Sequence, residues 1–274
     1  MSVPDPLNVT EPGRPLAVVT GASSGIGLEL AKQFATNGFD LVVAAEDEGI
    51  EQAAQELRGL GADVRASRVD LADFDGVEQL YADVRATGRP VEALALNAGV
   101  GSGGEFTGTD LRKELNVIAV NVTSTVHLAK RVIPDMVERG RGRVLVTSSI
   151  ASTQPGPYEA VYAATKAFDQ AFAESIRSEL KDSGVTVTSL MPGVTRTNFF
   201  ARAEMTDARA GSNESMQDDP AKVAEQGFTA LMDGEEKVVA GNPMNKVMAA
   251  AGRVTPDGLK AAAHKVLSRP GSGE

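Results

Sequence analysis

Short apolar runs alternate with amphipathic stretches along most of this 274-residue chain. The runs have the length of buried strands, and the stretches between them place apolar residues on one helical face. Such alternation indicates a parallel sheet covered by helices on both faces. The predicted strands are 16–20, 40–45, 63–67, 91–96, 143–149, 185–191 and a short one at 236–240. The predicted helices are 25–37, 48–60, 74–87, 109–135, 159–182 and 220–233.

The same pattern predicts the domain organisation. We expect a three-layer α/β fold with a doubly wound parallel sheet, in a single domain at residues 15–241. Residues 1–14 contain several prolines and no charged segment with an apolar core, which predicts a flexible tail and not a secretion signal. The Ala-rich residues 242–267 predict a C-terminal helical extension, and 268–274 a second flexible tail.

A glycine-rich loop follows the first predicted strand and opens the first predicted helix. It contains Gly21, Gly25 and Gly27. Strand, glycine loop and helix are the context that a dinucleotide phosphate site requires, because the helix N-terminus offers free N–H groups and a positive dipole end. No Gly-Lys-Ser/Thr follows the loop, so the spacing disfavours a nucleoside-triphosphate P-loop.

Tyr162 and Lys166 lie four residues apart in a predicted helix, so both side chains share one face. A phenol has an ordinary pKa of about 10, and a neighbouring ammonium lowers it. The pair is therefore a candidate general acid/base that exchanges a hydroxyl proton. Without further context, the alternative is a half-buried tyrosine beside a solvated lysine.

Six motifs in this order resemble the short-chain dehydrogenase/reductase family over about residues 14 to 240. The motifs are Thr20–Gly27, Asp70-Leu71, Asn97-Ala98-Gly99, Asn121, Ser149 with Tyr162 and Lys166, and Pro192-Gly193 followed by Thr197. The resemblance implies a Rossmann fold and an NAD(P)-dependent oxidoreductase. Such an enzyme transfers hydride between the nicotinamide and a carbonyl/alcohol carbon of a small, partly apolar substrate.

The resemblance implies a role for each member of the catalytic set. Ser149 would hydrogen-bond the substrate oxygen while Tyr162 exchanges its proton, and Ser148 should point to the opposite side of the strand. Lys166 would also bind the nicotinamide ribose. Asn121 would hold a water that links the lysine to solvent; the alternative is a polar residue that kinks the helix.

The resemblance also implies the cofactor-binding residues. Asp70 would bind the adenine amino group, and Thr197 would hold the nicotinamide carboxamide. The segment Asn97-Ala98-Gly99 would shape the groove by backbone contact, with a structural role for the Asn97 side chain. The full set is Gly21, Ser23, Ser24, Gly25, Ile26, Gly27, Glu46, Asp70, Leu71, Asn97, Ala98, Gly99, Tyr162, Lys166, Pro192, Gly193, Thr195 and Thr197.

The end of the second predicted strand bears on the choice between NAD and NADP. Glu46 and Asp47 follow this strand, where NADP-using relatives tend to carry arginine. Carboxylates repel a 2′-phosphate and can accept hydrogen bonds from a free 2′-hydroxyl, so NAD is favoured. The acidic residue of NAD-using relatives usually stands at the position of Ala45, so NADP remains the alternative.

Composition excludes several classes of function. The net charge of −10 argues against nucleic acids and anionic membranes as partners, and no apolar run approaches the length of a membrane span. Cysteine is absent, which excludes disulfides and thiolate sites and fits a cytoplasmic location. His127 and His264 are far apart, so we expect no metal site and interpret each as a helix-surface residue.

The substrate and the partners are predicted only by class. Residues 198–219 correspond to the family's mobile substrate lid, and 101–104 and 154–158 are candidate pocket walls. The resemblance implies a homodimer or homotetramer through helices 109–135 and 159–182. The alternatives are an NADP-linked ketone reductase of the same fold, or a non-catalytic nicotinamide-nucleotide-binding regulator, which the intact Ser/Tyr/Lys set disfavours.

Overall fold

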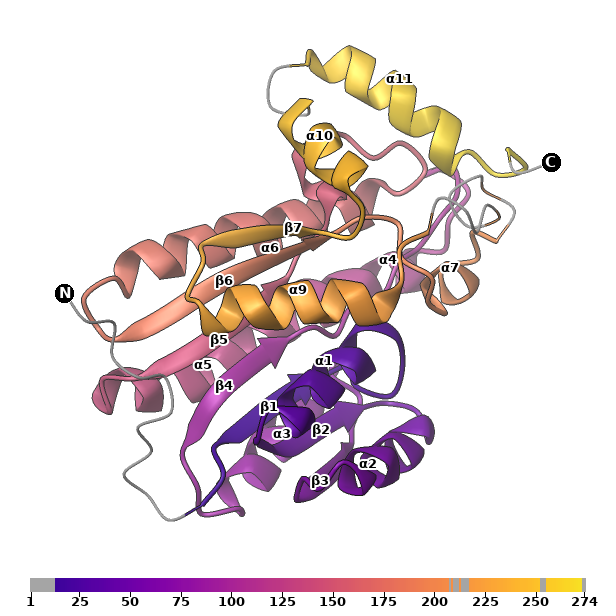
Figure 1. The fold of residues 1–274 in the computed structure, drawn as a ribbon. Coiled ribbons are helices and arrows are strands. Elements are labelled where there is room, and N and C mark those ends of the chain that lie inside the picture. Colours follow the sequence, from indigo (N-terminus) through magenta and orange to yellow (C-terminus); the bar gives the residue numbers. More distant parts are fainter. Residues whose placement is uncertain (1–12, 207, 209–211, 213–216, 252–254, 273–274) are drawn as a thin grey trace.

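A computed structural model describes residues 13–206, 208, 212, 217–251 and 255–272 of the chain. The described residues form one parallel sheet of seven strands in the order β3-β2-β1-β4-β5-β6-β7 (Figure 1). The strands are β1 (Leu16–Thr20), β2 (Asp40–Ala45), β3 (Val64–Arg68), β4 (Val91–Leu96), β5 (Gly142–Thr147), β6 (Val185–Pro192) and β7 (Lys237–Ala240).

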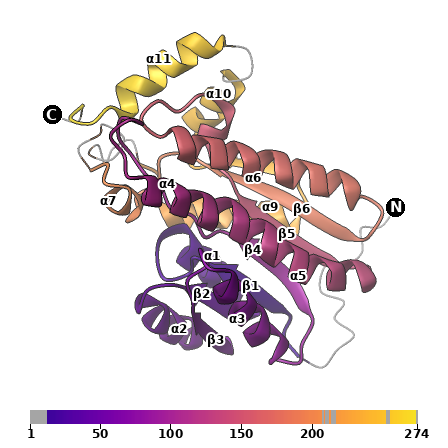
Figure 2. The same ribbon diagram turned by 180° about the vertical axis from the view of Figure 1, so that it is seen from behind.

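Helices cover both faces of the sheet, as Figures 1 and 2 show from opposite sides. The helices α1 (Gly25–Thr36), α2 (Gly49–Gly59) and α9 (Pro220–Met232) pack on one face. The other face carries α3 (Phe74–Arg85), α5 (Ser124–Glu138) and α6 (Ala160–Glu179). The remaining elements are α4 (Leu111–Ile118), the π-helical turn η1 (Ala119–Thr123), the 3₁₀ turn η2 (Ile150–Thr153), α7 (Phe199–Arg202), α10 (Pro243–Ala251) and α11 (Asp257–Ser268).

Two apolar cores follow from the alternation of side chains along the strands. In β1, Ala17 and Val19 face the core under α1, α2 and α9, where Phe34 contacts Phe228 edge to face at 5.1 Å. Leu16 and Val18 belong instead to the core under α3, α5 and α6. Every residue of β1 is buried, which explains its continuous apolar run.

The predicted doubly wound sheet is confirmed, and the predicted strands match the observed ones within two residues. The single helix predicted over 109–135 is wrong, because α4, η1 and α5 divide this stretch. A π-helical turn occurs where Asn121 directs its side chain into the protein interior. Turns of this kind are frequent at functional sites.

The C-terminal extension forms two helices, and α11 ends at Ser268, one residue beyond the predicted limit. Figure 1 shows α10 and α11 above the carboxyl ends of the strands. The predicted N-terminal tail lies almost entirely outside the described residues. None of the described helices is both long and apolar enough to cross a membrane.

The strand order reverses between β1 and β4, both of which pair with their neighbours in parallel. In such sheets, the crevice outside the carboxyl ends of the strands at this switch point is the usual ligand site. The fold therefore places the glycine loop, which follows β1, beside the segments that follow β4 and β5.

Candidate active site

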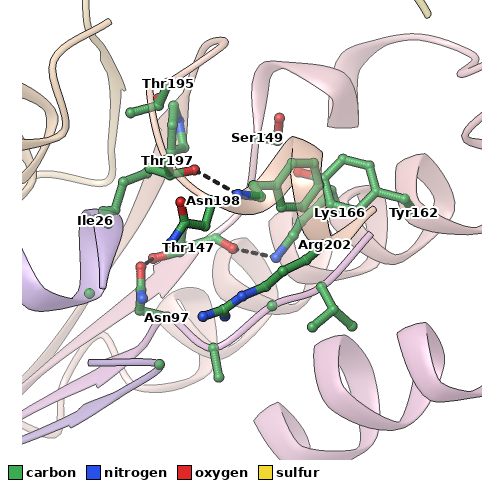
Figure 3. Close-up of a pocket in the computed structure, with 18 of the residues that line it drawn as sticks. Ile26, Asn97, Thr147, Ser149, Tyr162, Lys166, Thr195, Thr197, Asn198 and Arg202 are labelled. Atoms are coloured by element: carbon green, nitrogen blue, oxygen red, sulfur yellow. Dashed lines mark hydrogen bonds between the residues drawn. The ribbon is translucent and has the colours of Figure 1, made fainter. Parts of the chain in front are cut away.

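One pocket lies at this switch point, and its lining extends from the glycine loop to residues of α11. Every residue predicted to bind the cofactor or to act in catalysis lines this pocket, with the exception of Asn121. Ile26, Thr197 and Tyr162 converge on it from three separate elements (Figure 3). The fold thus brings together motifs that span most of the chain.

The glycine loop has a backbone that other residues could not adopt easily. Gly21 and Gly25 have φ angles of +67° and +57°, in the left-handed region that favours glycine. A Cβ on Gly27 would lie 2.1 Å from the Gly21 carbonyl oxygen. The loop therefore brings bare backbone and the N-terminus of α1 to the pocket, which fits the pyrophosphate of a dinucleotide.

A hydrogen-bonded clamp joins the carboxyl ends of β1, β4 and β5. The Thr20 hydroxyl oxygen accepts hydrogen bonds from the backbone N–H groups of Asn97 and Ala98, each at 3.0 Å. The Asn97 amide donates to the Thr20 carbonyl at 3.1 Å and accepts from the Thr147 hydroxyl at 3.1 Å. Asn97 therefore holds the three strand ends together, and its contact with a cofactor stays a prediction.

The acidic side chain held in the groove after β2 is Asp47. It accepts a hydrogen bond of 2.8 Å from the Ser23 hydroxyl and pairs with Arg202 at 3.3 Å. The Glu46 side chain is exposed, and its carbonyl accepts from the Arg68 guanidinium at 3.2 Å. Both arginines come from other segments of the chain, so basic as well as acidic side chains stand at this edge.

Asp70 and Thr197 each support a turn at the pocket wall. The Asp70 carboxylate accepts from the Ala72 N–H at 2.8 Å, and its side chain is exposed. The Thr197 hydroxyl accepts from the Phe199 N–H at 3.2 Å, and a Cβ on Gly25 would lie 2.9 Å from its methyl group. Both line the pocket, and their contacts to a cofactor stay predictions.

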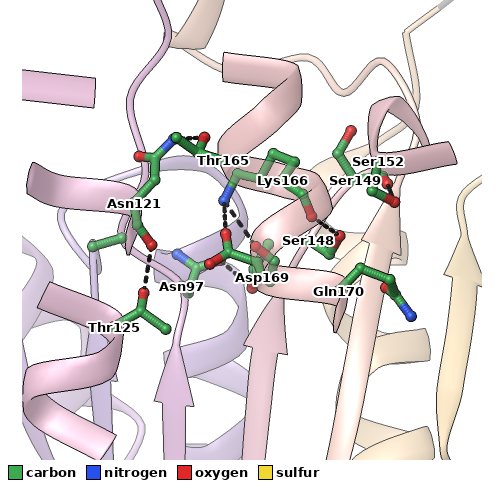
Figure 4. Close-up of polar contacts among 12 residues, drawn as sticks. Asn97, Asn121, Thr125, Ser148, Ser149, Ser152, Thr165, Lys166, Asp169 and Gln170 are labelled. Carbon is green, nitrogen blue, oxygen red and sulfur yellow. Dashed lines mark hydrogen bonds and ion pairs between the residues drawn. The ribbon is translucent and has the colours of Figure 1, made fainter. Parts of the chain in front are cut away.

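Ser149 and Ser148 differ in orientation, as Figure 4 shows. The buried Ser148 hydroxyl donates to the Lys166 carbonyl at 2.9 Å. The Ser149 hydroxyl oxygen accepts from the Ala151 N–H at 3.1 Å, and Ser149 lines the pocket together with Tyr162. The two serines thus differ as their alternation along the strand predicts, and the role of Ser149 toward a substrate stays a prediction.

Lys166 is held by two oxygens and not by solvent. Its ammonium donates to the Thr147 carbonyl and to Asp169, each at 2.9 Å (Figure 4). The lysine and aspartate side chains are only 5% and 2% exposed. Burial raises the pKa of Asp169, and Lys166 opposes that rise. Sequence reasoning missed Asp169, although its spacing from Tyr162 and Lys166 places all three on one helical face.

The structure corrects the expected acidity of Tyr162. Burial raises the pKa of the phenol above its ordinary value, and the charges of Glu159 and Asp169 raise it further. The hydrogen bond from Ser149 acts in the opposite direction and does not compensate. The net direction is therefore opposite to the lowered pKa that the spacing of Tyr162 and Lys166 predicts.

Asn121 is fully buried behind the pocket. Its amide donates to the Val100 carbonyl at 3.0 Å and to the Thr165 hydroxyl at 2.9 Å, and its side-chain oxygen accepts from the Val100 N–H at 2.9 Å. The residue ties the loop after β4 to α6. The water relay that the resemblance implies stays a prediction.

A polar cluster where α11 meets the pocket escaped the sequence analysis. Glu159 accepts from the Ser268 hydroxyl at 2.7 Å and lies 3.0 Å from His264 Nε2. Gln154 contacts His264 Nδ1 at 3.1 Å. The interpretation of His264 as a helix-surface residue is wrong, because α11 folds over the pocket and buries it. Nothing in the sequence links positions 105 residues apart.

The described part of the predicted lid packs onto Tyr162. The ring centroids of Phe199 and Tyr162 are 5.0 Å apart, and Phe200 contacts Phe199 edge to face at 5.5 Å. A Cβ on Gly101 would lie 2.5 Å from the Phe199 ring. Residues 207, 209–211 and 213–216 of the predicted lid lie outside the described residues. No group of three potential metal ligands occurs within the described part of the chain.

Comparison with known proteins places this fold and site in a family. The family model for short chain dehydrogenases matches residues 15–208. The mouse protein Dehydrogenase/reductase SDR family member 7B is 31% identical over 225 residues, which cover 79% of this chain and 70% of that protein. The chain therefore belongs to the short-chain dehydrogenase/reductase family.

Two further similarities are informative. The 1-deoxy-11-beta-hydroxypentalenate dehydrogenase of Streptomyces exfoliatus is 38% identical over 181 residues, or 65% of this chain and 66% of that enzyme. A short-chain dehydrogenase from Sphingobium yanoikuyae in complex with NADPH superposes with a TM-score of 0.78 at 28% identity, covering 93% and 95% of the two chains. Other solved structures of this fold hold NADP or NAD, which is consistent with the predicted NAD or NADP.

Proposed function

We propose that the protein is an oxidoreductase that transfers hydride between NAD(P) and a carbonyl/alcohol carbon, with Tyr162 as general acid/base. The observation that carries the proposal is the presence of Ser149, Tyr162 and Lys166 in the same pocket as the glycine loop. This intact set disfavours the alternative of a non-catalytic nucleotide-binding regulator, which would not need it.

Each residue of the Ser149, Tyr162 and Lys166 set has its own part in the proposed reaction. The bound cofactor supplies or accepts the hydride. Ser149 donates a hydrogen bond to the substrate oxygen, and Tyr162 gives or takes the proton at the same oxygen. Lys166 keeps its ammonium beside the ribose position by its bond to the Thr147 carbonyl. Phe199 covers Tyr162 and reduces the access of water.

We infer a small, partly apolar alcohol or ketone as the substrate. Phe199 and Phe200 provide apolar walls, and Gln154, Glu159 and His264 provide polar ones. The similar Streptomyces exfoliatus enzyme is named as the dehydrogenase of a hydroxylated pentalenate, which is consistent with a partly apolar alcohol.

NAD is the cofactor that we favour. Asp47 is held at the groove by Ser23, and Glu46 stands beside it, so both carboxylates would oppose a 2′-phosphate. NADP-linked ketone reduction is the second candidate. The observation in its favour is the presence of Arg68 and Arg202 at the same edge.

We also propose a homodimer or homotetramer, formed through α4 and α6. Leu111, Leu115 and Ile118 are exposed on α4, and Phe168 on α6 stacks with Phe172 at 5.8 Å. Such exposed apolar side chains are typical of a contact surface. Light scattering at micromolar concentration tests this proposal, which a monomer would contradict. A cytoplasmic location stays a prediction.

Separate titrations with NADH and NADPH test the proposed function, followed by a panel of alcohols and ketones monitored at the nicotinamide absorbance. We expect saturable binding of at least one cofactor and turnover of partly apolar members of the panel. Tyr162→Phe serves as the control for chemistry that does not use this site. Tight cofactor binding with no turnover of any compound by the wild-type protein would favour the regulator.

A further inference from the structure

Four polar side chains form a connected cluster where α11 meets the pocket. His264 contacts Gln154 through Nδ1 at 3.1 Å and Glu159 through Nε2 at 3.0 Å, and Ser268 donates to Glu159 at 2.7 Å. All four residues line the pocket, and α11 lies above the carboxyl ends of the strands (Figure 1). The hydride and proton transfer proposed above uses none of them, so the cluster has no assigned role.

The contacts of His264 fix where its hydrogen lies. A carboxylate only accepts hydrogen bonds, so Nε2, which faces Glu159, carries the hydrogen. In the neutral ring Nδ1 is then an acceptor, and the atom of Gln154 that contacts it is the amide nitrogen, a donor. The imidazole is therefore fully satisfied as a neutral group, and the cluster carries the negative charge of Glu159.

The cluster has acceptor oxygens that its own members do not use. The hydrogen bonds from His264 and Ser268 both fall on Oε2 of Glu159. Within the described residues, Oε1 of Glu159 accepts no hydrogen bond, and neither does the side-chain oxygen of Gln154. Glu159 is only 8% exposed, and a buried carboxylate is costly unless its lone pairs meet donors. The cluster is therefore suited to a ligand that supplies a donor.

The pocket offers no cation for an anionic group at this end. Lys166 and Arg202 line the pocket, and each already forms an ion pair with an aspartate. In the part of the chain that the structure describes, the only ion-pair partner of Glu159 is His264. A carboxylate or phosphate of a substrate would therefore meet the charge of Glu159 without a counterion.

We propose that this polar cluster binds a second hydroxyl group of the substrate, so that the enzyme acts on neutral ketones or alcohols that carry a hydroxyl away from the reacting carbon. The hydroxyl donates a hydrogen bond to Oε1 of Glu159, and the side-chain oxygen of Gln154 is a second acceptor. The inference rests on the proposed function and adds to it the class of substrate.

The position of the cluster indicates how such a substrate lies. Glu159 directly precedes α6 and Tyr162 is the third residue of that helix, so the two side chains leave the chain about one helical turn apart. Ile150, Phe199 and Leu267 give the same pocket an apolar lining. A carbon ring with its carbonyl at Tyr162 and its hydroxyl at Glu159 fits this arrangement.

Three ketones of one ring size test the inference. They are cyclohexanone, hydroxycyclohexanone and oxocyclohexanecarboxylate, the last two with the substituent opposite the carbonyl. We expect the wild-type protein to reduce the hydroxyketone with a kcat/KM at least about tenfold above that for cyclohexanone, the equivalent of one hydrogen bond to a charged group. The carboxylate analogue should be a poorer substrate than cyclohexanone, because its charge opposes that of Glu159.

Glu159→Gln identifies the cause, because it keeps the shape of the side chain and removes its charge. The ratio of kcat/KM between the hydroxyketone and the carboxylate analogue should fall by about tenfold or more. Glu179→Gln makes the same change at the exposed last residue of α6, outside the pocket, and should leave the ratio unchanged. If Glu159→Gln fails to fold, Gln154→Met decides, since it removes the second acceptor and should lower the preference for the hydroxyketone several-fold.

A binding experiment separates this inference from the proposed function. Ligand-observed NMR with reduced cofactor present compares the affinities of cyclohexanediol and cyclohexanol without any turnover. Tighter binding of the diol that Glu159→Gln abolishes would support the inference even if no ketone is reduced, a result that would overturn the proposed function. A diol that binds no more tightly than cyclohexanol, or equal kcat/KM for the two neutral ketones, would overturn the inference even in an active enzyme.

Discussion

The glycine loop and the cluster around His264 line opposite ends of one pocket and are built in different ways. In the loop, Gly21 and Gly25 present backbone in the left-handed region, within seven residues of sequence. The cluster joins Glu159 to His264 by side chains 105 positions apart. We call the end of the pocket at the glycine loop the cofactor half, and the end at Glu159 and His264 the substrate half, after the roles proposed for them. The cofactor half depends on local backbone geometry, and the substrate half depends on long-range side-chain contacts.

This difference indicates which half of the pocket depends on the identity of its side chains. A pyrophosphate is recognised by N–H groups and a helix dipole, which any sequence with the right glycines provides. A substrate is recognised by particular side chains, and under the proposed function Gln154, His264 and Ser268, which line the pocket, would provide them. Substitutions in the two halves should therefore separate cofactor affinity from substrate affinity.

The largest effect is expected where the two halves meet, at Tyr162. Tyr162→Phe keeps the ring beside Phe199 and removes the hydroxyl, so turnover should fall by about 10²–10⁴-fold, the usual contribution of a positioned acid/base. Cofactor affinity should change little. Steady-state kinetics with a substrate of the wild-type protein measures turnover, and titration measures cofactor affinity. Near-normal turnover by Tyr162→Phe would refute the role of Tyr162.

Displacement of the glycine-loop backbone should weaken cofactor binding. Gly27→Ala places a methyl group 2.1 Å from the Gly21 carbonyl, so the loop and α1 must separate. We expect cofactor binding to weaken by at least about tenfold, the equivalent of one charge-assisted hydrogen bond. Gly59→Ala, with nothing within 4 Å of the added Cβ, is the matched control. Equal cofactor affinity in both variants would contradict the backbone account.

The substrate half should fail when α11 loses its contact to Glu159. His264→Ala leaves that buried carboxylate with one partner fewer, and the KM for a substrate should rise by about tenfold while cofactor affinity stays constant. Val266→Ala on the exposed side of the same helix should change neither quantity. A parallel loss of cofactor affinity in His264→Ala would show that the two halves are not separable.

The smallest effect concerns the choice of cofactor. Glu46 is exposed, so its charge acts through water and should contribute about 1 kcal/mol, or roughly fivefold, to the preference for NAD. Glu46→Arg should remove or reverse this preference, and added salt should diminish it. Competitive titration of NADH and NADPH at low salt measures it. Tighter binding of NADPH to the wild-type protein would support the role of Arg68 and Arg202 instead.

The fold could be predicted from the sequence because short-range patterns of apolar residues and glycines indicate its strands, helices and turns. Apolar runs such as 40–45 and 91–96 coincide with β2 and β4, and the glycine loop lies where its motif predicts. The break within 109–135 was missed because a π-helical turn arises from the tertiary contacts of Asn121 with Val100 and Thr165. The local periodicity of apolar residues does not predict those tertiary contacts.

The electrostatics of the site could be predicted only in part. The position of Lys166 beside Tyr162 follows from helical spacing, and the pocket contains both. The direction of the phenol's pKa depends on burial and on Glu159 and Asp169, which no motif marks. The docking of His264 on Glu159 depends on where α11 packs, and this is a property of the tertiary fold.

The central claim is that the protein transfers hydride between NAD(P) and a carbonyl carbon with Tyr162 as general acid/base. Transfer of deuterium from the cofactor tests it most directly. A reactive ketone would be incubated with reduced cofactor deuterated at the nicotinamide C4 position, in separate reactions for its two faces. Mass spectrometry of the alcohol then reports the label. We predict one deuterium on the carbinol carbon from one face of the cofactor with the wild-type protein, and at least about a hundredfold slower transfer with Tyr162→Phe. No label from either face, or equal transfer by both proteins, would contradict the account.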